Sequence, residues 1–162
     1  MATEGRPSSS LLDTDLQDSA TFNIGIVVSE WNEDITNALL EGALVVFKNA
    51  DANIMHLAHV PGAFELPVTA QMLLTKDPKL DGILVIGSVI QGETRHFDFV
   101  CQGVTQGIMD VMLKFNKPIS FCLLTDLNLQ QSVDRSGGKH GNKGTECAVT
   151  LLKMIHLQKA IQ

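Results

Sequence analysis

Short apolar runs alternate with amphipathic stretches along most of this sequence, and that alternation limits the folds open to the chain. Four short runs predict strands: residues 22–29, 53–60, 83–88 and 118–124. The first is nearly continuous and rich in β-branched residues, as expected for a strand buried on both faces. Helical spacing follows each run. Strands separated in this way predict parallel pairing with right-handed crossovers. We therefore expect an α/β fold, a three-layer α/β/α sandwich around a four-stranded parallel sheet.

The segments between the strands carry the start and stop signals of helices. Asn32 or Asp34 is predicted to cap the first helix, which ends near Asn49. Pro67 falls in the first turns of the second, where a missing N–H matters least. The remaining helices are expected over residues 98–115, 128–135 and 143–160, after a second helix over 63–75. A glycine- and lysine-rich loop separates the last two.

The length and the local amino-acid composition predict one domain preceded by an N-terminal arm. The chain has 162 residues, of which 44% are hydrophobic, enough to bury one sizeable core. Residues 1–20 are rich in serine, aspartate and small residues and lack a sustained apolar period. We expect residues 1–20 to be a flexible N-terminal arm and residues 21–162 to be a single domain.

Charge and cysteine usage exclude several classes of protein. Asp and Glu outnumber Lys and Arg by 18 to 12, giving a net charge of −6 that disfavours a general nucleic-acid binder or a polybasic membrane binder. The three cysteines include no CxxC motif, so neither a disulfide framework nor a zinc site is expected. With no signal peptide or apolar membrane segment either, we expect a cytoplasmic protein.

Unusual residues follow the predicted strand ends, where parallel sheets bind ligands. Trp31 follows the first strand and offers a flat surface on which a planar ring could stack, although a single loop aromatic is more often a packing residue. Residues 92–96 lead into a helix N-terminus, which favours an anion such as phosphate. His96 lies beside that point and could transfer protons at neutral pH; its alternative role is a cap or a surface residue.

A second basic cluster lies between the last two helices. Arg135, Lys139, His140 and Lys143 stand among four glycines. The cluster is either a solvated hinge or an anion clamp in which Arg135 makes directional contacts with phosphate. It is not a P-loop, and no GxGxxG follows the first strand. No metal site is expected, because His56 and His59 would face opposite sides of one strand.

Five stretches taken together, in this order and spacing, resemble the 6,7-dimethyl-8-ribityllumazine synthase family. They are residues 27–32 (VVSEWN), 60–67 (VPGAFELP), 87–98 (GSVIQGETRHFD), 124–125 (LT) and 135–144 (RSGGKHGNKG). The resemblance runs from about Phe22 to Leu157 and implies flavodoxin-like strand order. It also implies the penultimate step of riboflavin biosynthesis, in which a ribitylaminouracil condenses with 3,4-dihydroxy-2-butanone 4-phosphate. That chemistry needs no cofactor and no metal.

The resemblance assigns roles position by position. His96 would be the catalytic proton-transfer residue, and Lys143 would support the site. Backbone N–H groups of Glu93 and Thr94 would bind phosphate, opposed by Arg135. Substrate would contact eight further residues, among them a stacking tryptophan and a phenylalanine that reaches a neighbouring subunit's site: Trp31, Ala63, Phe64, Glu65, Ser88, Val89, Ile90 and Phe121.

Three positions depart from the family pattern. Trp31 replaces a commoner phenylalanine, which keeps the stacking face and could tighten the binding of flavin-like ligands. Gln91 stands where a basic residue is frequent. Glu93 brings a carboxylate to the phosphate site, which repels phosphate unless the side chain turns outward.

The resemblance also implies an assembly. Family members form pentamers with active sites between subunits, and some pack into sixty-subunit icosahedral shells, with riboflavin synthase as a further candidate partner. The short 135–143 stretch lacks the insertion typical of stand-alone pentamers and favours a shell. Two alternatives remain open at this point: a flavin-binding module of flavodoxin type and a catalytically inert structural shell.

Overall fold

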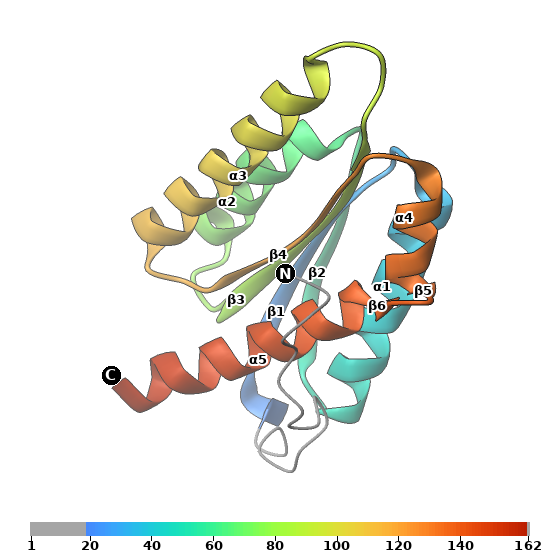
Figure 1. Ribbon diagram of the computed structural model, residues 1–162. Coiled ribbons are helices and arrows are strands. Elements are labelled where there is room, and N and C mark those ends of the chain that lie inside the picture. The colour runs from blue at the N-terminus through green and yellow to red at the C-terminus, as the bar shows by residue number, and fades with distance from the viewer. Residues whose placement is uncertain (1–18, 162) are drawn as a thin grey trace.

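The strands form one parallel sheet between two layers of helices. The computed structural model describes residues 19–161, and Figure 1 shows α2 and α3 on one side of the sheet and α1 and α5 on the other. The strands are β1 (Asn23–Ser29), β2 (Asn53–Val60), β3 (Gly82–Ile90) and β4 (Ile119–Asp126), and their order is β2-β1-β3-β4. Every neighbouring pair is parallel. The predicted three-layer α/β/α sandwich with flavodoxin-like order is confirmed.

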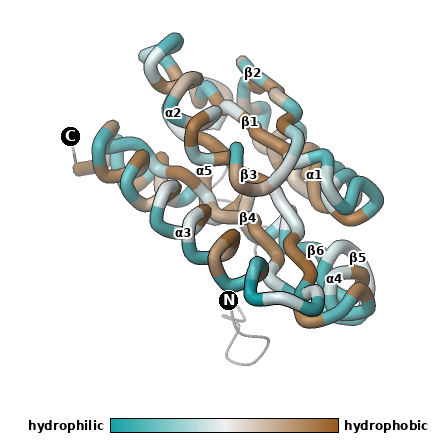
Figure 2. Tube along the Cα trace, turned by 90° about the horizontal axis from the view of Figure 1, so that it is seen from above, coloured by the Kyte–Doolittle hydropathy of each residue, from teal (hydrophilic) through white to brown (hydrophobic). Residues whose placement is uncertain are grey.

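Alternation along the strands divides the core into two. Ile24, Ile26 and Val28 of β1 pack in the cluster that contains α1 and α5, whereas Val27 belongs to the opposite cluster under α2 and α3. Residues on one strand alternate between the two faces, so a strand covered on both sides must be apolar at nearly every position. Figure 2 shows this pattern from above, with mostly brown strands at the centre and teal on the outward parts of the helices.

The helices largely follow the predicted segments. They are α1 (Glu33–Asn49), α2 (Leu66–Lys76), α3 (His96–Phe115), α4 (Leu129–Arg135) and α5 (Lys143–Ile161). Pro67 lies in the first turn of α2, as predicted. Two boundaries differ, because residues 63–65 form a separate 3₁₀ turn, η3, and because α3 begins two residues before the predicted start. The second difference makes His96 the first residue of α3.

Two local predictions were wrong. Asn32 occupies the N-cap position of α1 in the left-handed region, at φ 60°, but neither it nor Asp34 caps the helix with its side chain. Instead the Asn32 amide donates a hydrogen bond of 2.9 Å to the carbonyl of Ser88, tying the loop after β1 to β3. The basic loop also contains a small antiparallel pair, β5 (Ser136–Gly138) and β6 (Gly141–Asn142).

Most of the predicted N-terminal arm lies outside the described residues, since the structure describes nothing before Ser19. Residues Ser19–Thr21 form a 3₁₀ turn, η2, in which the buried Ser19 hydroxyl hydrogen-bonds to His156 of α5 over 3.2 Å. Between residues 19 and 161, no helix has the length and apolarity to cross a membrane.

The histidines of β2 have separate positions. The His56 ring lies 2.9 Å from the Asp77 carboxylate at the end of α2, and this hydrogen bond lowers the pKa of Asp77. His59 is exposed. Within residues 19–161, no group of three or more histidine, cysteine, aspartate or glutamate side chains is arranged to hold a metal ion.

Candidate active site

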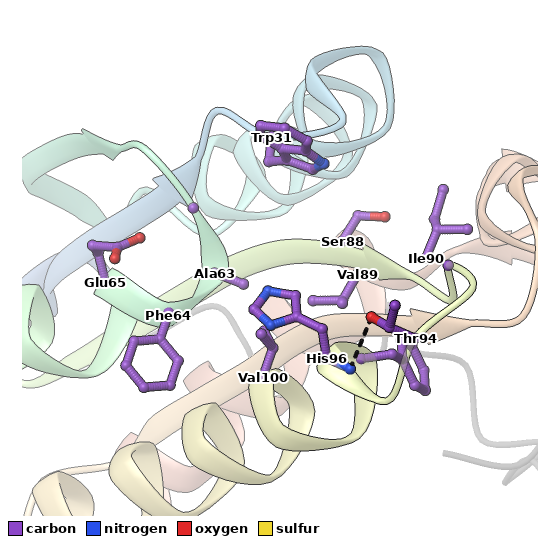
Figure 3. A pocket seen from close by; sticks show the side chains of 13 residues that line it. Trp31, Ala63, Phe64, Glu65, Ser88, Val89, Ile90, Thr94, His96 and Val100 are labelled. Atoms are coloured by element: carbon purple, nitrogen blue, oxygen red, sulfur yellow. Dashed lines mark hydrogen bonds between the residues drawn. The ribbon is translucent and has the colours of Figure 1, made fainter.

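One pocket lies where β1 and β3 end and α3 begins. Its volume is about 360 Å³. This is the point at which the chain connections leave the sheet in opposite directions, the usual ligand position in open α/β sheets. Nine of the residues assigned to a site from the sequence line it together (Figure 3): Trp31, Ala63, Phe64, Glu65, Ser88, Val89, Ile90, Thr94 and His96.

Trp31 forms one wall of this pocket from the turn between β1 and α1. Its side chain is 72% exposed, so packing inside this chain does not cover the indole. Figure 3 shows it across the pocket from His96. The left-handed Asn32 and its bond to Ser88 fix the turn that carries it. The geometry favours a stacking surface over the alternative of a buried packing residue.

The η3 turn forms a second wall. Ala63 is buried, whereas Phe64 is 60% exposed. The Phe64 ring nevertheless rests on α3 at Gly103, where a Cβ would come within 2.7 Å of a ring carbon. Gly103 therefore lets the ring lie close to the helix backbone. The Glu65 carboxylate turns back towards Gly62, which leaves its oxygens beside the pocket.

The end of β3 forms the floor. Ser88, Val89 and Ile90 are its last three residues. Ser88 is only 2% exposed, and among the described residues its hydroxyl oxygen has no hydrogen-bond partner. Sequence reasoning gave Ser88 a backbone role only, and nothing in the pattern pointed to an orphaned hydroxyl beside the pocket.

His96 projects from the first turn of α3 into the pocket (Figure 3). Its backbone N–H donates a 3.4 Å hydrogen bond to the Thr94 hydroxyl, and its side chain is exposed. A helix N-terminus attracts negative charge, so the imidazole lies beside a natural anion position. Val100 also lines the pocket, and its i, i+4 spacing from His96 on one helix could have revealed this.

Glu93 is exposed and lines neither this pocket nor the cavity described next. Its chain neighbours Gly92 and Thr94 do line the pocket. Gly92 faces open space, because a Cβ there would meet no atom within 4 Å.

Three assigned residues lie elsewhere. Phe121, Arg135 and Lys143 line a second cavity of about 300 Å³ between β4, α4 and α5. The sheet order leaves β4 at an edge of the sheet. Apart from Glu93, this one chain therefore carries the assigned residues in two groups, one at the pocket and one at the β4 edge.

Local contacts hold both cations of the second cavity. The Arg135 side chain is 25% exposed; its Nη1 donates to the carbonyl of Gln131 over 2.9 Å, and its Nε lies 3.7 Å from Asp126 Oδ1. The Lys143 ammonium donates to both carboxylate oxygens of Glu146, at 2.9 and 2.7 Å. Arg135 and Lys143 are thus held on α4 and α5, whereas Lys139 and His140 lie in the turn between β5 and β6.

Fold and pocket together define a class: a parallel α/β sandwich with a ligand pocket at the switch point of its sheet. The 6,7-dimethyl-8-ribityllumazine synthase family model matches residues 21–159. Three proteins named 6,7-dimethyl-8-ribityllumazine synthase are similar to this chain. That of Flavobacterium johnsoniae is 47% identical over 161 residues, covering 98% of this chain and 84% of the relative.

The other two come from Christiangramia forsetii and Cytophaga hutchinsonii. The first is 47% identical over 161 residues, covering 98% of this chain and 96% of the relative. The second is 55% identical over 134 residues, covering 81% and 83%. The chain belongs to the 6,7-dimethyl-8-ribityllumazine synthase family.

Proposed function

We propose that this protein is a transferase of riboflavin biosynthesis. It condenses 5-amino-6-(D-ribitylamino)uracil with 3,4-dihydroxy-2-butanone 4-phosphate to give 6,7-dimethyl-8-ribityllumazine, phosphate and water. Family membership supports this reaction. The structural observation that carries it is the pocket itself, which brings an exposed indole, a carboxylate and an imidazole to one helix N-terminus. Neither a flavin-binding module nor an inert shell requires that combination.

The pocket suits the aminouracil. The pyrimidine would stack on Trp31, whose face is free, and its polar edge would bind backbone groups of residues 88–90. Ala63 and Phe64 supply apolar contacts, and Glu65 accepts hydrogen bonds from the ribityl hydroxyls. Holding the ring in this way places its amino group for attack on the ketone, and such positioning is the larger part of the catalysis.

His96 would move the protons. Imine formation, loss of phosphate and ring closure each need a proton added or removed near the reacting carbons. The imidazole lies inside the pocket at the start of α3, next to the position where the helix N-terminus attracts the phosphate. Backbone N–H groups of Glu93 and Thr94, which lie just before α3, would bind the phosphate at that position.

A neighbouring subunit would complete the site. We assign Phe121, Arg135 and Lys143 to the partner's pocket, because within one chain they line a different cavity from His96. Exposed aromatic side chains support a docking edge here: Phe99 on α3 is 63% exposed and Phe121 on β4 is 37% exposed. Burying them against a second copy removes apolar surface from water.

The assembly that follows is a ring. A surface that docks on a different surface of the next copy closes into a cyclic oligomer, here the pentamer. The short 135–143 stretch favours further packing of pentamers into a shell, which could enclose riboflavin synthase, and the site of action would be the cytoplasm. Sedimentation velocity separates a pentamer from a sixty-subunit shell directly.

Replacing His96 by asparagine is expected to lower kcat by about 10²-fold, at the low end of general acid–base effects, because positioning survives. Steady-state turnover is measured from lumazine absorbance and released phosphate, against the uncatalysed reaction. His59→Asn, an exposed histidine on β2, is the matched control and should keep wild-type turnover. A folded, assembled protein with no acceleration over background would refute the synthase assignment.

Shared sites predict complementation between two impaired variants. Co-expressed His96→Asn and Arg135→Ala chains should form mixed rings in which about a quarter of the sites join an intact His96 to an intact Arg135 from the next chain. Activity should therefore exceed that of either variant alone. If both residues served one site within a single chain, every site in the mixture would carry a lesion, and no recovery would be seen.

A further inference from the structure

Two buried thiols meet between β4 and α5. Cys122 is 1% exposed and Cys147 is 6% exposed. The Ser120 hydroxyl donates a 2.8 Å hydrogen bond to the backbone carbonyl of Cys147. Because Ser120 and Cys122 are two residues apart on β4, their side chains share one face of the sheet. Cys147 is therefore anchored over the face that carries Cys122.

The Cys147 sulfur lies beside the backbone that leads into Cys122. The Cys147 thiol donates a 3.7 Å hydrogen bond to the backbone carbonyl of Phe121, the residue before Cys122. Interaction with Cys147, together with burial, raises the pKa of Cys122 well above its usual range. The same interaction lowers the pKa of Cys147. Cys147 is thus the thiol of the pair that forms a thiolate first, with Cys122 poised beside it.

The thiol pair borders a cavity between β4, α4 and α5. Cys122 and Cys147 line the same 300 Å³ cavity as Arg135 and Lys143. Both thiols are free in this structure. The remaining cysteine, Cys101, lies on α3 across the sheet, and burial raises its pKa. The chain thus holds one thiol pair and one separate thiol.

We propose that Cys122 and Cys147 form an oxidisable dithiol that a hydroperoxide converts into an intramolecular disulfide. The Cys147 thiolate attacks the peroxide oxygen, which breaks the O–O bond and, with hydrogen peroxide, gives a sulfenic acid and one water. The Cys122 sulfur then displaces the hydroxyl group as a second water. Two thiols and one peroxide become one disulfide and two waters, and a small thiol reductant reverses the change by exchange.

The disulfide would change phosphate binding in the cavity lined by Arg135 and Lys143, a consequence that rests on the proposed function. Forming an S–S bond of about 2.05 Å draws Cys147 towards β4. Lys143 and Glu146, which form a buried ion pair, lie in the turn of α5 that immediately precedes Cys147. Moving that turn changes the geometry with which Lys143 and Arg135 face a phosphate, and oxidised protein binds phosphate several-fold more weakly.

The test is a thiol count on the assembled protein. Wild-type protein is treated with hydrogen peroxide, quenched with catalase, then denatured and alkylated before mass analysis. One alkylated cysteine, Cys101, and a Cys122–Cys147 cross-linked peptide are expected, and dithiothreitol before alkylation should restore three. Cys101→Ser should form the same cross-link, whereas Cys147→Ser should not. Three alkylated cysteines after oxidation, or a cross-link that includes Cys101, would overturn the proposal.

Calorimetric titration with inorganic phosphate tests the coupling. Oxidised wild type should bind several-fold more weakly than reduced wild type, while Cys147→Ser should respond little to peroxide. A disulfide that leaves phosphate affinity unchanged would overturn the proposed link between the thiol pair and phosphate binding by Arg135 and Lys143. Failure of the synthase assignment is seen separately, because it removes turnover from the reduced protein and leaves the cross-link intact.

Discussion

Replacing Arg135 by alanine is expected to lower kcat/KM for the butanone phosphate by about 10²- to 10⁴-fold, since two charge-assisted hydrogen bonds are each worth about 1.5–3 kcal/mol. The side chain is already oriented in the free chain: Gln131 accepts from its Nη1 and Asp126 lies beside its Nε. A guanidinium held in this way loses little freedom when phosphate arrives. Its removal should therefore cost most of the contact energy.

The effect should be specific to one substrate. The KM for the butanone phosphate should rise strongly, while the KM for the aminouracil should change little, because Trp31 and residues 88–90 hold that ring in the other pocket. Arg135→Lys should recover part of the loss, since it restores charge without the planar fork. Lys139→Ala, an exposed lysine in the same basic cluster, is the control. An increase confined to the aminouracil KM would contradict the assignment.

The fold followed from the sequence because its central strands, β1 and β3, are buried on both faces. β1 must be apolar at nearly every position to serve two helical layers, and the run from Phe22 to Ser29 is readable for that reason. The first residue of α3 was harder to predict from the sequence. Arg95 stands at its N-cap without a side-chain capping bond, so no capping residue marked His96 as the first helical position.

The pocket was predictable to the extent that it is built from consecutive loops. Parallel strands bring their carboxyl ends to one edge, so Trp31, the 63–65 turn and residues 88–96 had to meet. Sequence order alone could not separate Arg135 from them. That separation arises because β4 is an edge strand and Arg135 lies on α4 beside it, facing a different cavity.

The left-handed backbone conformation of Asn32 could not be predicted from the sequence either. Its residue type predicts a helix cap, and capping competes with other local hydrogen bonds that asparagine can make. Here the Asn32 side chain instead donates its hydrogen bond to the carbonyl of Ser88, 56 positions further along the chain. Long-range partners of this kind depend on strand register, which a single sequence does not fix.

Replacing Gly144 by alanine is expected to destabilise the protein by more than about 3 kcal/mol, beyond the usual cost of overpacking. Gly144 lies in the first turn of α5, where α5 crosses α1. A Cβ there would lie 1.8 Å from the backbone oxygen of Leu39 and 2.6 Å from its carbonyl carbon. Backbone atoms inside a helix cannot move aside as a side-chain tip can, so the two helices would have to separate.

Alanine substitutions at two further glycines, Gly42 and Gly92, are expected to destabilise the protein less. The three atoms nearest to a Cβ on Gly42 of α1 all belong to the side chain of Asn142, the closest at 2.5 Å. That side chain can move, but it would give up its amide hydrogen bond of 2.8 Å to the carbonyl of Ala38. Gly42→Ala should therefore cost about 1–3 kcal/mol. Gly92→Ala meets nothing within 4 Å and should stay within about 0.5 kcal/mol of wild type.

Urea unfolding of the assembled protein, or the yield of soluble protein where Gly144→Ala does not fold, ranks the three variants. The order of destabilisation should be Gly144→Ala, then Gly42→Ala, then Gly92→Ala. A Gly144→Ala protein as stable as Gly92→Ala would mean that α1 and α5 do not approach as closely as described. The same contact positions the first turn of α5, so whatever Gly144→Ala protein folds should also bind phosphate weakly, because Lys143 is the adjacent residue.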